Sequence, residues 1–186
     1  MTPDSASSLA ALEARLAQDL EYLGFPGRQW MPARQKDGEA MLDVAVIGGG
    51  QAGLAASVAL AQQGIRAVVF DRSPASREGP WATTARMETL RSPKELTGPA
   101  LGLPSLTFRA WFEAQFGLEA WTALDKIPRL QWMDYLSWYR RVMNVDVRND
   151  TAVTGIHPLP DGTAVRLDLR TPAGDRRVFA RRVVLA

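Results

Sequence analysis

Three glycines directly after a short apolar run constrain the fold more than any other feature of this chain. The run 43–47 leads into Gly48, Gly50 and Gly53, spaced as G-x-G-x-x-G, and an alanine-rich stretch that favours a helix follows. In such a strand–turn–helix unit the first glycine permits a tight turn. The second lets a pyrophosphate approach the backbone, and the third lets the helix pack close to the strand. The residues expected to hold the pyrophosphate, mainly through backbone groups, are Gly48, Gly50, Gln51, Ala52 and Gly53.

An acidic residue lies where a dinucleotide ribose is expected. The second apolar run, 65–70, ends at Asp71, about 20 residues beyond the glycines, where a carboxylate can accept hydrogen bonds from ribose hydroxyls. Asp71 also disfavours a 2′-phosphate at this site, because two negative groups repel each other. The adjacent Arg72 is a second candidate for the adenosine end, and a solvated arginine is the alternative.

The order of predicted elements indicates an α/β chain in two parts. Residues 1–40 comprise a start expected to be disordered (1–6), a leucine-rich helix (9–23) and a polar connector (26–40). Residues 41–186 are expected to form the dinucleotide-binding domain. Its expected strands are 41–47, 65–70, 145–147, 152–156, 164–170, 177–180 and 182–186, and its expected helices are 51–63, 107–116 and 130–142. The pattern predicts a Rossmann-like fold with a parallel βαβ core, an antiparallel β-meander, an N-terminal helix and inserted helices.

Composition excludes several classes of function. With 22 basic and 20 acidic residues the net charge is +2, and the arginine pairs at 176–177 and 181–182 are expected to be solvated, so no nucleic-acid partner is predicted. The absence of cysteine excludes a disulfide and a thiolate metal site within these residues. The single histidine, His157, lies in a turn-like stretch without an acidic cluster and predicts no metal site. No apolar run reaches membrane-spanning length and no secretory signal sequence is visible, so a cytoplasmic chain without a membrane partner is expected.

The order of motifs resembles that of the FAD/NAD(P)-dependent flavoprotein monooxygenases, which include the class B enzymes and the FAD-dependent urate hydroxylase type. Residues 43–57 are similar to their FAD fingerprint, and Gly79-Pro80-Trp81 resembles their Gly-Gly-x-Trp motif. Residues 89–94 lie where their chain passes the flavin ring, and 183–186 resemble the strand that leads into their Ala-Thr-Gly motif.

The chain also departs from the family pattern. Pro80 replaces a glycine of the tryptophan motif, and Ser57 stands where the fingerprint usually has Gly or Ala. A second glycine-rich site, for a nicotinamide cofactor, is missing from the 186 residues. The chain is therefore expected to be a fragment of a longer protein and not to turn over alone.

The resemblance implies an FAD cofactor, with NAD(P)H as co-substrate in the full-length protein. It implies an oxidoreductase that hydroxylates a small organic substrate with O2 through a flavin peroxide. It assigns Trp81 to a wall for the flavin, with buried packing as the alternative, and the Val153 backbone to the adenine. Arg86, Arg91 and Lys94 become candidates for contact with the flavin or an anionic cofactor, with an ordinary surface or loop charge as the alternative for each.

No catalytic acid or base is named, since the flavin carries the redox chemistry in such enzymes. Two other functions stay open: another FAD-dependent oxidoreductase, either a reductase or an oxidase, and a non-catalytic dinucleotide-binding module. No oligomeric state is predicted.

Overall fold

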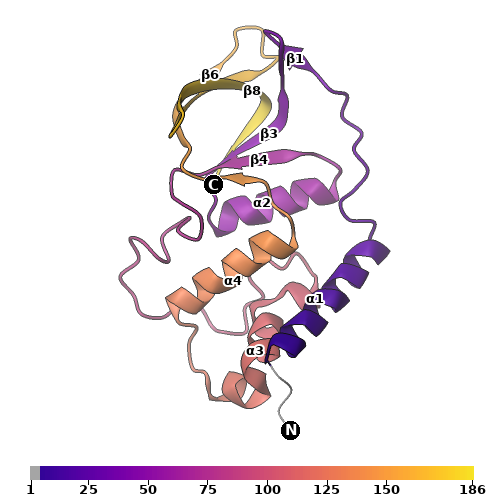
Figure 1. Ribbon diagram of the computed structural model, residues 1–186, viewed down its shortest axis with the longest axis vertical. Coiled ribbons are helices and arrows are strands. Elements are labelled where there is room, and N and C mark those ends of the chain that lie inside the picture. The colour runs from indigo at the N-terminus through magenta and orange to yellow at the C-terminus, as the bar shows by residue number, and fades with distance from the viewer. Residues whose placement is uncertain (1–4) are drawn as a thin grey trace.

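A six-stranded sheet with the order β5-β4-β3-β8-β7-β6 organises the computed structural model, which describes residues 5–186 (Figure 1). The central strand β3 pairs in parallel with β4 on one side and with β8 on the other, and β5 extends the parallel part. Strands β6, β7 and β8 form the antiparallel meander. The strand bounds are β3 Leu42–Ile47, β4 Ala67–Phe70, β5 Val147–Arg148, β6 Ala152–Pro158, β7 Val165–Thr171 and β8 Gly174–Leu185. The predicted α/β fold class is confirmed.

Strand β8 belongs to both parts of the sheet. Its Ala180 pairs with Val165 of β7 and also with Leu42 of β3, so one strand passes from the meander into the parallel sheet. The expectation of two separate strands, 177–180 and 182–186, was wrong. Arg181, the one residue between them, does not end a strand, because it is buried within the continuous β8.

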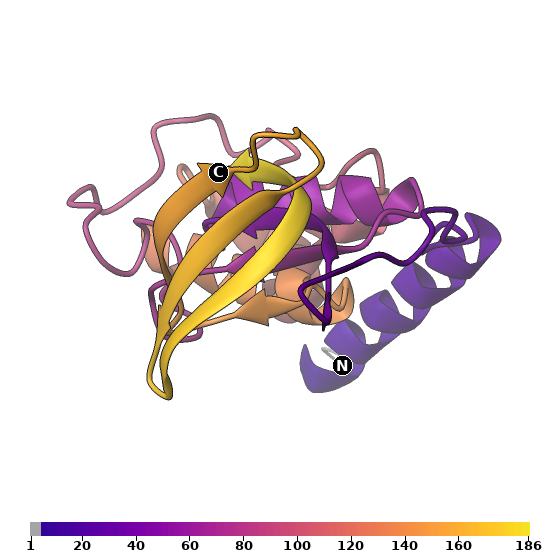
Figure 2. The same ribbon diagram turned by 90° about the horizontal axis from the view of Figure 1, so that it is seen from above.

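The alternation of side chains along β3 separates two apolar layers. Ala45 faces the meander and packs with Phe70 and Leu167, whereas Val44 and Val46 face the helices. Figure 2 shows the meander strands as a layer outside the parallel strands, with the helices beyond. The parallel strands are therefore covered on both faces, which explains their nearly continuous apolar sequences.

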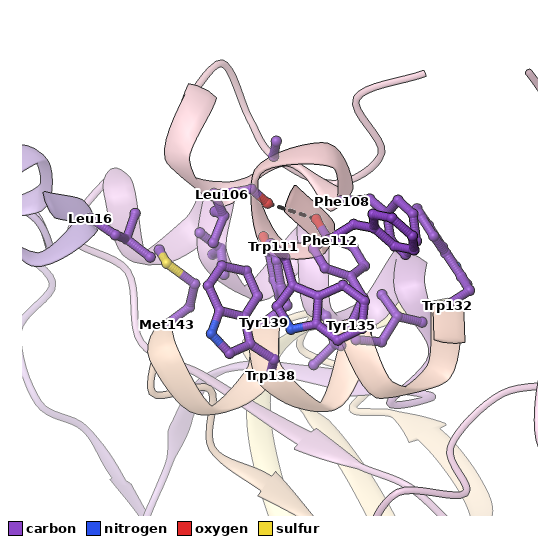
Figure 3. Packing of buried hydrophobic residues seen from close by; sticks show 14 of the residues in the cluster. Leu16, Leu106, Phe108, Trp111, Phe112, Trp132, Tyr135, Trp138, Tyr139 and Met143 are labelled. Carbon is purple, nitrogen blue, oxygen red and sulfur yellow. Dashed lines mark hydrogen bonds between the residues drawn. The ribbon is translucent and has the colours of Figure 1, made fainter. Parts of the chain in front are cut away.

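The helices form an aromatic core on the other side of the sheet (Figure 3). Tyr135 and Tyr139 of α4 are fully buried there, and Leu16 of α1 reaches the same cluster. The Tyr135 hydroxyl donates to the Leu106 carbonyl at 2.7 Å, and burial raises the pKa of both tyrosines. The helix bounds are α1 Ser5–Tyr22, α2 Gln51–Gln62, η1 Pro104–Leu106, α3 Phe108–Ala123 and α4 Arg129–Val142.

Three local features differ from the sequence-based expectations. Helix α1 begins at Ser5, so residues 5–6 are helical, and the disorder expected for residues 1–4 lies outside the described residues. Two short strands, β1 Gln35–Lys36 and β2 Glu39–Ala40, form a hairpin within the connector. Helical structure resumes after Gly117, whose φ of 84° produces a kink in α3.

A buried ion pair ties the connector to the sheet. The Arg181 Nε atom lies 3.1 Å from Asp43 Oδ1, and the same guanidinium donates to the Pro32 carbonyl. Arg181 was expected to be solvated, and this expectation was wrong because its charge is neutralised at the start of β3. Among residues 5–186, no helix is both long and apolar enough to cross a membrane.

Candidate dinucleotide site

Two of the three motif glycines are required by the fold itself. Gly48 follows β3 with a φ of 109°, and a Cβ atom there would lie 2.4 Å from the Ala186 carbonyl oxygen. A Cβ on Gly53 would lie 1.9 Å from the Gly48 carbonyl oxygen. The start of α2 therefore packs directly against the turn after β3, and neither position can accept a side chain.

Gly50 is different. Its φ of −70° suits any residue, and a Cβ atom would meet only Gly79, whose Cα would lie at an ordinary contact distance of 3.4 Å. The chain thus leaves room for a side chain where the motif has none. Gly50 caps α2 without a side-chain hydrogen bond, and the first N–H groups of a helix lack partners within it. Gln51 is half-buried and Ala52 is exposed at this helix start.

Asp71 anchors the glycine loop. Its side chain is only 6% exposed. Its Oδ2 atom accepts from the Gly49 N–H at 2.6 Å, and its Oδ1 atom accepts from the Ser73 N–H at 2.7 Å. A carboxylate offers about four acceptor positions, so positions remain for a ribose hydroxyl. Asp71 therefore has a structural role that the sequence did not predict, and its contact with a ribose stays a prediction.

The start of the meander adjoins Asp71. The Thr151 N–H donates to the Asp71 carbonyl at 2.8 Å, and Val153 follows two residues later on β6. Strand β6 is at the edge of the sheet and pairs only with β7 among the described strands, through Leu169 opposite Val153. One edge of the backbone around Val153 is therefore open to a ligand. Arg72, which follows Asp71 in the sequence, is exposed.

Trp81 lies near the other end of the glycine loop. Its ring meets that of Trp132 edge to face, with centroids 6.5 Å apart. The Trp132 indole N–H donates to Gln51 Oε1 at 3.2 Å, and the Arg129 guanidinium donates to the Trp81 carbonyl. The side chain of Gln51 is thus engaged by a hydrogen bond. Through Trp132, Trp81 is connected to the start of α2, whereas Asp71 bonds to the loop at Gly49.

Sequence reasoning missed a buried carboxylate beside the loop. Glu78 is 3% exposed, and its Oε1 atom accepts from both Arg140 and Asn149 at 2.6 Å. The residue stands in a polar segment of alternating charge, where a solvated glutamate is expected, and only its position before Gly79 could have drawn attention to it. Glu78 and Arg140 also line a cavity of about 360 Å³.

The other charged candidates differ in their surroundings. Lys94 donates to the carbonyls of Trp121, at 2.8 Å, and Leu124, so its ammonium group completes the end of α3. Arg86 and Arg91 are exposed. His157 lies on β6 rather than in a turn, and its Nε2 atom is 2.9 Å from Asp168 Oδ2. Within residues 5–186 no cluster of His, Cys, Asp or Glu side chains could hold a metal ion.

Comparison with known proteins is consistent with this geometry. A family model described as FAD-NAD(P)-binding matches residues 45–186. A curated protein of Xanthomonas campestris pv. campestris, FAD-dependent urate hydroxylase, is 46% identical over 180 residues. The alignment covers 96% of this chain and 37% of that protein, so this chain spans little more than a third of the relative's length.

Solved structures share the fold over 78% of this chain. A flavin-containing monooxygenase from Stenotrophomonas maltophilia is 26% identical with a TM-score of 0.59, and the match covers 38% of its chain. An ornithine N-hydroxylase from Kutzneria sp. 744 is 22% identical with a TM-score of 0.64, and the match covers 37% of its chain. The second similarity concerns the fold alone.

Proposed function

The chain belongs to the FAD-NAD(P)-binding family, and on that premise we propose that it is the FAD-binding portion of an NAD(P)H-dependent flavin monooxygenase. The proposed reaction is the hydroxylation of a small organic substrate with O2. The 46% identity to a FAD-dependent urate hydroxylase supports this reaction class and makes urate the first substrate to test. We also propose that residues 1–40 form an added helix and connector on a dinucleotide-binding domain of residues 41–186.

The proposed site extends along the carboxyl ends of the parallel strands. The backbone of Gly48, Gly50, Gln51, Ala52 and Gly53 would hold the pyrophosphate at the start of α2, where free N–H groups and the helix dipole favour an anion. Asp71, with Arg72 beside it, would hold the adenosine ribose, and the open edge at Val153 would contact the adenine. Trp81 would form a wall for the flavin.

The protein itself would bind and orient FAD and would exclude water from it. Bound FAD supplies the redox chemistry with NAD(P)H and O2, and the protein sets its orientation and surroundings. The Trp132 ring meets the Trp81 ring edge to face, and Arg129 bonds to the Trp81 backbone carbonyl. The half-buried Trp81 ring would exclude water from one side of a bound flavin.

The free space around Gly50 is the observation that carries the proposal. Gly48 and Gly53 lack side chains because the fold has no space for them, but a Cβ on Gly50 would meet no clash within the chain. A bound pyrophosphate supplies the missing reason for a glycine, since it must approach this backbone closely.

A graded substitution at this position tests the proposal. The purified chain is titrated with FAD, with flavin absorbance and fluorescence as readouts, and compared with Gly50→Ala and Gly50→Val. We expect bound flavin in the unaltered chain, weaker binding in Gly50→Ala and loss in Gly50→Val, with little change in melting temperature. Ala123→Val, at the exposed end of α3, is the matched control and should bind normally.

A folded chain that binds no FAD would refute the proposed site. Equal FAD binding in both Gly50 variants would show that the pyrophosphate does not approach this backbone. The reaction itself is tested on a protein of the relative's length, by urate-dependent oxidation of NAD(P)H and consumption of O2. NAD(P)H oxidation without O2 uptake would favour a reductase instead.

A further inference from the structure

A network of polar contacts centred on the buried Glu78 carboxylate lies behind the glycine loop, and its Arg140 side chain is 26% exposed. Arg140 of α4 donates to Glu78 Oε1 at 2.6 Å, to Asn149 Oδ1 at 2.8 Å and to the Val147 carbonyl at 2.8 Å. Asn149 donates to Glu78 Oε1 at 2.6 Å and to the Ser73 carbonyl at 3.0 Å. These bonds connect the segment after β4, helix α4 and the segment after β5. Glu78 is the acceptor shared by both donors.

Glu78 is in contact with the loop through its aliphatic part. A Cβ atom built on Gly49 would lie 3.1 Å from Glu78 Cγ and 3.2 Å from Asp71 Cβ. The two acidic side chains, with Val147 Cγ1 at 3.2 Å from the same point, therefore fill the space that a Gly49 side chain would occupy, and Asp71 also accepts the Gly49 N–H. The loop at Gly49 cannot move toward this side without displacing Glu78 or Asp71.

A carboxylate as buried as Glu78 gains little net stability from an ion pair, because it loses its hydration. The arrangement of Glu78 and Arg140 at this place is better explained by a fixed geometry than by stability. The nearest contact that needs a fixed geometry is the hydrogen bond from the Gly49 N–H to Asp71. This bond sets the position of the loop backbone and of the carboxylate expected to meet the ribose.

We propose that Glu78 is a positioning residue for the adenosine half of the dinucleotide, and this inference rests on the proposed function. Glu78 fixes Gly49 and, through it, Asp71, so that the pyrophosphate-binding backbone and the ribose acceptor are in place before the ligand binds. Preorganisation of this kind raises affinity by removing the cost of ordering. Because the effect is on the adenosine half, which ADP and FAD share, the affinities for both ligands should depend on Glu78 to the same extent.

If Glu78 acted mainly through its charge, removing that charge would change ligand affinity in the opposite direction. A negative group near a bound pyrophosphate repels it, so removing the charge of Glu78 would tighten binding if repulsion were its main effect. Glu78→Gln separates the two roles, because glutamine keeps the contact with Gly49 and an oxygen that can accept from Arg140 and Asn149.

The experiment measures the dissociation constants of ADP and FAD by isothermal titration calorimetry on the full 186-residue chain. We expect Glu78→Ala to weaken both ligands by the same factor, about tenfold. Glu78→Gln should stay within about twofold of the unaltered chain. If Glu78→Ala does not fold, Asn149→Ala removes one of the two bonds to Glu78 and should weaken both ligands equally, by a smaller factor.

Leu167→Ala is the control for a general loss of stability. Leu167 is fully buried on the meander side of the sheet, so this variant should melt earlier yet bind ADP normally below its transition. The proposal is overturned if Glu78→Ala leaves ADP binding unchanged or weakens FAD alone. It is also overturned if Glu78→Gln tightens binding, or weakens it as much as Glu78→Ala does. A loss of ADP affinity in Leu167→Ala as large as that in Glu78→Ala would overturn it too. A folded, unaltered chain that binds neither ligand refutes the proposed function itself.

Discussion

The buried pair of Arg181 and Asp43 gives the most direct test of how the fold is held together. The two side chains are 9% and 6% exposed, and the pair joins residues 138 positions apart in the sequence. Removing one partner of a buried pair leaves the other charge unpaired and typically costs about 3–5 kcal/mol. Asp43 keeps a second cation, Arg66, at 3.6 Å, but that side chain is 59% exposed. We therefore expect Arg181→Met to lower the free energy of unfolding by about 3 kcal/mol, the low end of that range.

Urea denaturation followed by circular dichroism measures this change. With a slope of about 2 kcal/mol per molar urea, the midpoint should fall by about 1.5 M. Arg182→Met is the matched control, because Arg182 is the exposed neighbour on the same strand and its loss should cost less than about 0.5 kcal/mol. The double variant Asp43→Val/Arg181→Met should regain most of the loss, since an apolar pair needs no partner charge. A midpoint for Arg181→Met no lower than that of Arg182→Met would refute the reasoning.

Three further outcomes follow from individual contacts. Tyr135→Phe leaves the Leu106 carbonyl without its donor and should lower the free energy of unfolding by about 1–2 kcal/mol, measured by urea denaturation. The hydrogen bond from Arg141 lowers the pKa of Glu13. The stability that this bond contributes is present at pH values above the ordinary glutamate pKa of about 4.3, and it is lost as the pH falls through the lowered pKa. The stability difference between Glu13→Gln and the unaltered chain should therefore shrink on acidification, and a constant difference would contradict the assignment. Lys94→Met should lower the melting temperature without changing FAD affinity, because its ammonium group bonds to carbonyls at the end of α3.

Local patterns in the sequence were sufficient to predict the strand–helix–strand unit. The glycine spacing, the apolar runs and the turn residues each depend on neighbours within a few positions, and the structure contains the elements they indicated. The continuous strand β8 was not predictable in this way. Whether Arg181 ends a strand or lies buried within it depends on Asp43, which is remote in the sequence.

The candidate site was predictable to a similar degree. The glycines and Asp71 follow from a spacing that has a chemical reason, and the structure brings them to one edge of the sheet. Glu78 has no such spacing, because its partners come from α4 and from the segment after β5. Lys94 was assigned to an anionic ligand by its charge alone, whereas its acceptors are backbone carbonyls that no composition reveals.

The two-sided pairing of β8 has a consequence for the order in which the protein can be made. Strands β3 and β4 are close in the sequence, so their pairing needs no later segment, but the other edge of β3 is completed only by residues 180–185. Until then the nascent chain presents an apolar, open strand edge, which is a template for aggregation. Shortened versions that stop before Gly174 should therefore require chaperones or precipitate, even though every glycine of the motif is already present in them.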